Sequence, residues 1–379
     1  MSHARPAVPA RPPRDTRVDV VRGWLQLTIF ASHAAGSWIG AWLIHGAWGL
    51  SDSSEQFVFL SGFMLGSVFA RKAIRQGWSS ASGDMLVRAA KLYRTHVLVL
   101  ALFGVLIILA CATGLWPMEA DRLGWGFMLR DPLHAIPAAL TTLYQPAFMD
   151  ILPIFFWCML VLPLFAWLEV RVGDWVLVVP VGLYAATWVF GLVPPSLGQD
   201  TAIGFNPFAW QILFLFGAWL GKRSLLLGES LPNWRWLTIG AFAVLAAGLW
   251  LRLAWFGFLP WNAPVDPSLL IIGKNELALP RVLHALALAW LVACFMPRDA
   301  RWMHHAFGRW MATAGRHSLQ VFCLGLFLSW GVTAAFRLWP AAWWLDPVLL
   351  LGGCAALLLF AQWLERQGEP AGVPVAARS

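Results

Sequence analysis

Residues 18–42 read VDVVRGWLQLTIFASHAAGSWIGAW, and this stretch decides the class of fold. From Val20 to Trp42 the side chains are mostly apolar or small, and about 20 such residues are enough to cross a bilayer. Arg22 and His33 interrupt the run, which is not expected of the apolar core of a cleavable signal peptide. We therefore expect a transmembrane helix that stays in the mature protein.

The composition of the whole chain of 379 residues also indicates a membrane protein. Hydrophobic residues make up 59% and charged residues only 12%, whereas soluble domains contain roughly 45–50% apolar and about 25% charged residues. A secreted disulfide scaffold, a disordered chain and a cytosolic enzyme are therefore excluded. The five cysteines all lie in apolar segments without CxxC spacing, so we interpret them as packing residues and expect neither disulfides nor a metal site.

Apolar segments of suitable length recur along the chain and predict an all-α integral membrane protein, a bundle of about ten transmembrane helices. We place them near residues 20–42, 53–70, 86–113, 151–169, 174–193, 207–221, 235–256, 279–296, 313–335 and 342–364. The longest connection, residues 114–150, is interrupted by prolines and is expected to be an outer loop. Around this core we predict a disordered basic cytoplasmic lead at 1–18, a single transmembrane domain at 19–366 and a cytoplasmic tail at 367–379.

The formal net charge of +8 fits this topology. Most of the 27 basic residues fall in short clusters on the side of the bilayer that also holds the N-terminus, as the positive-inside rule requires. Both termini are therefore predicted to be cytoplasmic. Nucleic acid would need a contiguous basic face, and none is evident, so no nucleic-acid partner is expected.

Ionisable side chains within a transmembrane helix are costly and therefore suggest function. Arg22 and His33 are eleven residues apart, which is about 20° beyond three full turns and about 16 Å along the axis. Asp19 and Gln26 lie on the same stripe, one turn on either side of Arg22. The alternative is an arginine that extends to the interface and a histidine bonded to a neighbouring helix.

Two carboxylates follow soon after the first helix. Asp52 and Glu55 are three residues apart at the start of the second segment, and a connection of about ten residues returns the chain close to His33. A carboxylate beside an imidazole raises its basicity, so either could form a catalytic His–carboxylate dyad that accepts a hydroxyl proton. The alternative role of these residues is to solvate the loop and cap the helix.

The remaining candidates are substrate-binding residues. Arg88, Lys91 and Arg94 follow one another at helical spacing in the third segment and, with Arg22, would make a cytoplasm-facing site suited to phosphates. Further polar positions, for which helix capping and interhelical hydrogen bonding are an equal alternative, are Asn206, Gln211, Arg316 and His317.

Six sequence blocks together resemble the OpgC-type membrane proteins, and their order spans nearly the whole chain. They are RDTRVDVVRG (14–23), IFASH (29–33), GLSDSSEQFVFLSGF (49–63), KLYRTH (91–96), NPFAWQ (206–211) and GRHSLQVF (315–322). That family is similar to the wider acyltransferase-3 superfamily, whose members resemble one another in about ten transmembrane helices and an Arg-x10-His pair, here Arg22 and His33. One departure is His33-Ala34-Ala35-Gly36, where a Pro-Gly after the histidine would be expected.

The resemblance implies an enzyme of the bacterial inner membrane that moves an acyl group from cytoplasmic acyl-CoA to a carbohydrate outside. In the OpgC case it implies succinylation of osmoregulated periplasmic glucans, with succinyl-CoA as donor substrate and no other cofactor. The family's catalytic histidine corresponds to His33 and its acidic residue to Glu55. Its basic patch corresponds to Lys91 and Arg94.

Three alternatives remain open at this point. One is an O-acetyltransferase acting on another envelope polysaccharide. Another is a transporter of an anionic or glycan substrate, although no internal repeat is visible. The last is a haem protein using His33 with His96 or His284. We expect direct attack on the thioester, because no serine is clearly placed beside His33.

Overall fold

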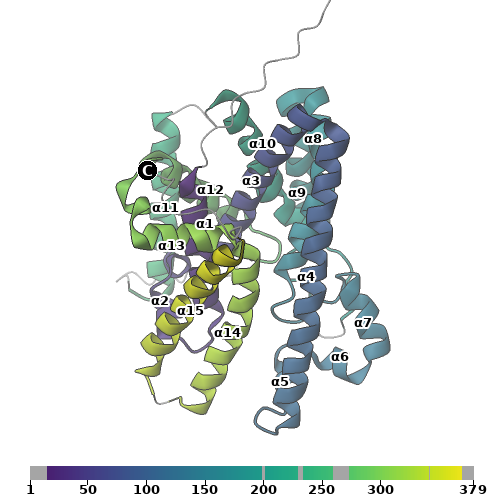
Figure 1. Cartoon of the computed structure of the whole chain (residues 1–379), viewed down its shortest axis with the longest axis vertical. Helices are drawn as coiled ribbons and strands as arrows, with labels where there is room; N and C mark the ends of the chain where they lie inside the picture. The colour runs from purple at the N-terminus through teal and green to yellow at the C-terminus, as the bar shows by residue number, and fades with distance from the viewer. Residues whose placement is uncertain (1–14, 199–200, 229–233, 259–272, 341, 369–379) are drawn as a thin grey trace, which may run out of the picture. The chain divides into compact units, whose positions relative to one another are not determined.

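The computed structural model describes residues 15–198, 201–228, 234–258, 273–340 and 342–368, and within these ranges every regular element is a helix (Figure 1). The chain divides into two compact units, which are described separately below. The first unit contains residues 58–237 and 264–283. The second contains residues 13–57, 238–263 and 284–379. The predicted lead and tail lie largely outside the described residues, and the predicted single domain at 19–366 remains a prediction.

The first unit is built around two long helices that run side by side, α4 (Trp78–Ala112) and α8 (Ile151–Val172) (Figure 1). A short 3-10 helix, η2 (Gly173–Leu177), leads from α8 into α9 (Val178–Phe190), and α10 (Pro207–Leu227) packs against both α8 and α9. The connection at 114–150 is not an open loop, because it folds into α5 (Glu119–Arg122), α6 (Gly126–Arg130) and α7 (Pro132–Leu140).

Small residues bring α10 against α3 (Ser53–Gln76), whose residues from Val58 onward belong to this unit. A Cβ atom at Gly62 would meet the backbone of Phe214, and one at Gly217 would meet the backbone of Phe59. Glycines at such positions allow helix backbones to approach closely, as is usual for helix pairs within membranes.

The second unit is organised around α1 (Thr16–His33), which packs against α13 (Ala306–Arg316) and α14 (Ser318–Leu338). Its other elements are α2 (Trp38–Trp42), η1 (His45–Ala47), the first turn of α3, most of α11 (Arg235–Trp255) and α12 (Leu279–Phe295), η3 (Arg301–His304) and α15 (Leu345–Gly368). Gly23 and Gly315 set the distance between α1 and α13, since a Cβ atom at either would meet a backbone carbonyl oxygen of the facing helix.

Each of the ten predicted segments contains a helix, but several boundaries differ. Helices α3 and α10 each run six residues beyond the predicted ends. The first segment ends early, because α1 stops at His33 and the chain turns at Gly36, whose φ is +96°. The third begins earlier than predicted, at Trp78. The ninth is divided at His317 into the end of α13 and all of α14.

Within the described residues, six helical stretches are long and apolar enough to cross a membrane, counting α8 and α9 as one stretch. They are Ser53–Gln76, Trp78–Ala112, Ile151–Phe190, Arg235–Trp255, Ser318–Leu338 and Leu345–Gln367. Helix α12 is apolar but has only 17 residues. The structure thus bears out a membrane-compatible helical protein, while ten spans and cytoplasmic termini remain predictions.

Candidate active site

The polar stripe predicted on the first transmembrane segment lies on one uninterrupted helix, α1. Asp19 and Gln26 are buried, and Arg22 and His33 are half-buried. Because α1 is continuous from Thr16 to His33, the eleven-residue separation of Arg22 and His33 gives the expected shared face, about 16 Å apart along the axis. The stripe therefore offers a cation near one end of the helix and an imidazole at the other.

His33 is the last residue of α1, and its ring is oriented by the helix itself. Its Nδ1 lies 2.8 Å from the carbonyl oxygen of Ile29, one turn earlier. A carbonyl oxygen can only accept a hydrogen bond, so Nδ1 donates and carries the proton. The lone pair of the neutral imidazole is then on Nε2, which is the atom able to act as a general base.

The two predicted carboxylates, Asp52 and Glu55, cap the N-terminus of α3 together. The Oδ1 atom of Asp52 accepts a hydrogen bond from the backbone N–H of Ser54 at 2.8 Å. The Oε2 atom of Glu55 accepts one from the backbone N–H of Asp52 at 2.9 Å, and the Glu55 side chain is fully buried. This is the geometry of a capping box. Both side chains therefore have the helix-capping role that was the alternative reading of the sequence.

Two contacts set the register between α1 and the start of α3. The hydroxyl oxygens of Thr28 and Ser53 are 2.7 Å apart, and the guanidinium of Arg22 lies 5.5 Å from the ring centroid of Phe57. The later residue of α3 thus contacts the earlier residue of α1, so the two helices are antiparallel.

This register separates the two carboxylates by their distance from the histidine. Asp52 is level with Ile29, the residue to which the His33 ring is bonded, whereas Glu55 lies one turn further along, roughly 5 Å away along the axis. Asp52 is therefore the carboxylate closer to the level of the imidazole. The sequence left this choice open, because it does not determine which residues on two helices are level.

At the end of α1 that carries Arg22, the side chain contacts the break between α13 and α14. Its Nη2 donates to Oγ of Ser318 at 2.5 Å. The two residues before Ser318 share one carboxylate: Arg316 Nη2 and His317 Nε2 each lie 2.6 Å from an oxygen of Glu365 on α15. Arg316, His317 and Glu365 form what we call the Glu365 cluster.

Glu365 was not among the residues singled out from the sequence. The sequence feature that could have identified it is a single carboxylate in the last turns of a mostly apolar helix. A charge at such a position needs a partner, and Arg316 and His317, which were predicted from the sequence as substrate-binding candidates, provide it. The structure therefore gives Arg316 an ion pair and His317 a hydrogen bond with the same carboxylate, and these contacts join the break between α13 and α14 to α15.

The basic residues of the third predicted segment belong to the first unit. Arg88 is bonded through Nε to Asp84 at 2.9 Å, and the same carboxylate lies 3.1 Å from Nζ of Lys72. Lys91 and Arg94 are exposed, and neither has an ion pair within the described residues. Asp84, which was not singled out from the sequence, lies one turn before Arg88 and neutralises part of the expected positive charge.

The length of α4 explains how these cations are tolerated. Its 35 residues extend for about 52 Å, well beyond a hydrocarbon core of about 30 Å. The 18 residues from Thr95 to Ala112 are enough to cross most of such a core, so we expect Arg88, Lys91 and Arg94 to lie on an extension of the helix at or beyond its edge.

Asn206 and Gln211 have structural partners in the first unit. Asn206 caps α10 by accepting from the N–H of Phe208 at 3.1 Å and donates to the carbonyl of Leu192 at 2.7 Å. Gln211 donates to the carbonyl of Pro180 at 2.9 Å and so joins α10 to α9. Their predicted role in substrate binding remains a prediction.

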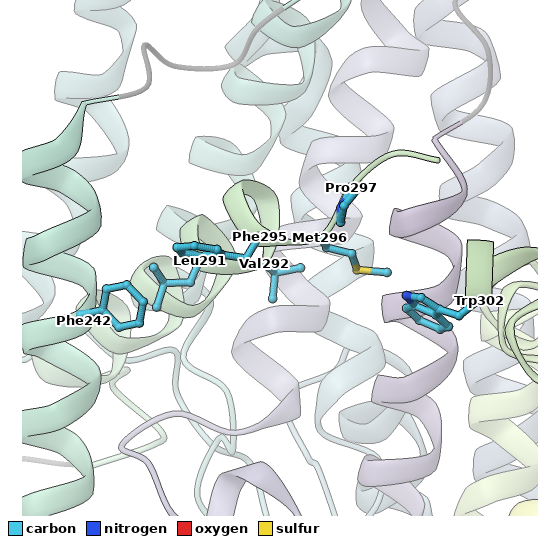
Figure 2. A pocket seen from close by; sticks show the side chains of 7 residues that line it. All are labelled: Phe242, Leu291, Val292, Phe295, Met296, Pro297 and Trp302. Atoms are coloured by element: carbon cyan, nitrogen blue, oxygen red, sulfur yellow. The ribbon is translucent and has the colours of Figure 1, made fainter. Parts of the chain in front are cut away.

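An apolar hollow of about 490 Å³ lies in the second unit (Figure 2). None of its side chains is charged; they are Phe242, Leu291, Val292, Phe295, Met296, Pro297 and Trp302. A surface of this kind suits hydrocarbon and offers no group for acid–base chemistry.

Comparison with known proteins gives one family. The sequence model of the family described as OpgC protein matches residues 14–369, which is nearly the whole chain. No curated protein and no solved structure matches significantly.

Proposed function

The chain belongs to the OpgC family, which suggests a glucan-modifying function of the acyltransferase type, and from this premise we propose that it is an acyl-CoA-dependent O-acyltransferase. The donor is proposed to be succinyl-CoA and the acceptor a hydroxyl of a periplasmic glucan. The observation that supports it best is the orientation of His33. Its Nδ1–H is bonded to the carbonyl of Ile29, so that Nε2 is the basic atom.

In the proposed reaction, His33 Nε2 takes the proton of the sugar hydroxyl as its oxygen attacks the thioester carbonyl carbon. The new C–O ester bond forms and the C–S bond breaks. The imidazolium then returns the proton to the departing CoA thiolate, which leaves as the free thiol, and the base is restored. Asp52, the carboxylate nearer the level of the ring, is proposed to stabilise the imidazolium.

The donor is a polyanion, and each unit carries cations that suit it. Arg22 is half-buried on the same face of α1 as His33, and its Nη2 donates to the hydroxyl of Ser318. Lys91 and Arg94 are exposed on the extension of α4. We propose that Arg22 contacts donor phosphates, while the α4 cations raise the local concentration of donor at the membrane surface.

The test uses purified protein in lipid with a neutral glucan and labelled succinyl-CoA or acetyl-CoA. Release of CoA and label on the glucan are followed for the native chain and for His33→Ala. The matched control is His134→Ala, since that histidine is exposed and lies in the first unit. We expect His33→Ala to lose about 10²–10⁴-fold in turnover, the usual contribution of a general base, and the control to lose none.

The choice of carboxylate is tested in the same assay. Asp52→Asn is expected to lower turnover more than Glu55→Gln when both are measured below their unfolding temperatures. Full activity in His33→Ala would contradict the proposed mechanism. Transfer from acetyl-CoA alone would keep the mechanism and change the donor.

A further inference from the structure

An exposed cluster of aromatic rings lies in the second unit, outside the groups assigned to the reaction. It consists of Trp42 and Trp48, from the connection between α1 and α3, and Phe256 and Phe258, from the residues just beyond α11; we call it the aromatic cluster. Its ring centroids are 4.9 Å apart for Trp42 and Phe256, 6.0 Å for Trp42 and Trp48, and 6.0 Å for Phe256 and Phe258. Trp42 and Trp48 are each 37% exposed.

The aromatic cluster differs from an ordinary set of membrane anchors. An interfacial tryptophan places its ring in the lipid and directs its N–H toward water and headgroups. The indole N–H of Trp48 instead donates to the carbonyl oxygen of Trp42 at 2.6 Å. Arg252 Nε also donates to the carbonyl of Gly49 at 2.8 Å, which ties the loop to α11. The rings are thus held in a fixed arrangement by contacts within the protein.

A buried polar group lies in the same loop. His45 is three residues from each tryptophan, and neither of its buried ring nitrogens makes a hydrogen bond of normal geometry within the described residues. Burial lowers the pKa of His45, and the negative charge of Asp52 and a weak interaction with the Asp52 backbone offset this only in part. The ring is therefore neutral near pH 7, with one nitrogen able to donate and one able to accept.

The chemistry of these groups selects the ligand. A pyranose ring has apolar C–H faces that stack on aromatic rings, and hydroxyls around its edge that both donate and accept. The nearby charged groups are opposite in sign, Asp52 and Arg252, so the surface favours a neutral molecule over the polyanionic donor. We propose that the aromatic cluster and His45 bind one neutral hexose unit of the glycan acceptor.

This inference rests on the proposed function and adds the acceptor side to it. The loop that carries the cluster leads directly to Asp52, the carboxylate nearer the level of His33. A sugar stacked on Trp42 and Trp48 would therefore be held by the same loop that ends at the catalytic groups.

The chain provides a matched pair of variants on one short helix. Trp38 and Trp42 begin and end α2 and are 45% and 37% exposed, but only Trp42 belongs to the cluster. Binding of a neutral glucose pentasaccharide to the full chain in nanodiscs is measured by saturation-transfer NMR without donor. We expect Trp42→Ala to weaken binding at least tenfold, Trp42→Phe to restore most of it, and Trp38→Ala to stay within twofold of the native chain.

Kinetics and a second residue complete the test. In the transfer assay Trp42→Ala should raise the KM for glucan and leave the KM for acyl-CoA unchanged. His45→Gln, which keeps a donor and an acceptor, should bind the pentasaccharide better than His45→Phe.

Each remaining outcome separates this inference from the proposed function. Equal pentasaccharide binding by the native chain and Trp42→Ala would overturn the sugar site even if acyl transfer is confirmed. Equal losses in Trp38→Ala and Trp42→Ala would also overturn it and would identify both as membrane anchors. Binding that depends on Trp42 in a chain that transfers no acyl group would support the sugar site and refute the proposed enzyme.

Discussion

Replacing Asp346 tests whether a single buried carboxylate holds the end of α1 and the loop after it in place. Asp346 lies in the first turn of α15 and is 1% exposed. Its Oδ1 accepts from the hydroxyl of Ser37 at 2.8 Å, and its Oδ2 accepts from the backbone N–H of Ile39 at 2.9 Å. The Ser37 hydroxyl oxygen in turn accepts from the N–H of Gly40 and caps α2. The carboxylate thus joins α15 to the residues that follow His33.

The magnitude follows from the groups left behind. In Asp346→Ala the Ser37 hydroxyl and the Ile39 N–H both lose their acceptor, and each unsatisfied buried group costs about 1–3 kcal/mol. Removing the carboxylate also removes its own desolvation cost, so we expect a net loss of about 2–5 kcal/mol in the free energy of unfolding. Asp346→Asn keeps one acceptor oxygen and should lose about half as much.

The assay is reversible unfolding in mixed micelles, with increasing sodium dodecyl sulfate and a spectroscopic measure of helix content. Asp121→Ala is the control, because that carboxylate is half-exposed and paired with Arg130 at the surface, where such pairs contribute about 0–1 kcal/mol. A loss below about 1 kcal/mol in Asp346→Ala, or equal losses in the Ala and Asn variants, would refute the reasoning.

Three further predictions concern packing and charge. Gly315→Val should destabilise the folded protein by about 1–3 kcal/mol, because the new Cβ would meet a backbone oxygen of α1. Gly240 faces open space, so Gly240→Ala should be neutral or slightly stabilising. Thermal unfolding of both variants checks this. Burial lowers the pKa of His45, so the unfolded chain binds the proton first as the pH falls through about 6.5, and the free energy of unfolding decreases. His45→Gln should reduce this pH dependence in unfolding measured from pH 8 to 5. Lys222→Met should lower the free energy of unfolding by about 3 kcal/mol, because the Glu169 carboxylate, which is 7% exposed, loses the ammonium 3.1 Å away. Adding Glu169→Gln should recover most of that loss in chemical unfolding.

Local patterns in the sequence correctly predicted several features. Long apolar runs interrupted by few charges predicted a membrane-compatible helical protein, because lipid exposure requires a continuous apolar surface and internally satisfied backbone bonds. The helical repeat placed Arg22 and His33 on one face, since that depends only on rotation per residue. The six blocks that resemble the OpgC family were sufficient to identify the membership that the family comparison shows.

Helix boundaries were predicted less well where chain geometry outweighs hydropathy. The run from Val20 to Trp42 consists mostly of apolar or small residues to its end, yet the helix ends at His33 because the chain turns at Gly36. The connection at 114–150 contains several prolines, yet it forms three short helices. Proline is compatible with the first turn of a helix, as at Pro132, so its presence alone did not exclude helix there.

The sequence by itself determined that the protein is compatible with a membrane, that it is helical, and which residues share a face of α1. Each of these properties depends on residues that are neighbours in the chain. Only the tertiary structure decided that Asp52 rather than Glu55 is nearer the level of the His33 ring, that Glu365 joins Arg316 and His317, and that the aromatic cluster exists. These relations join residues far apart in sequence. Their geometry depends on the register and packing of helices, which hydropathy and periodicity do not encode.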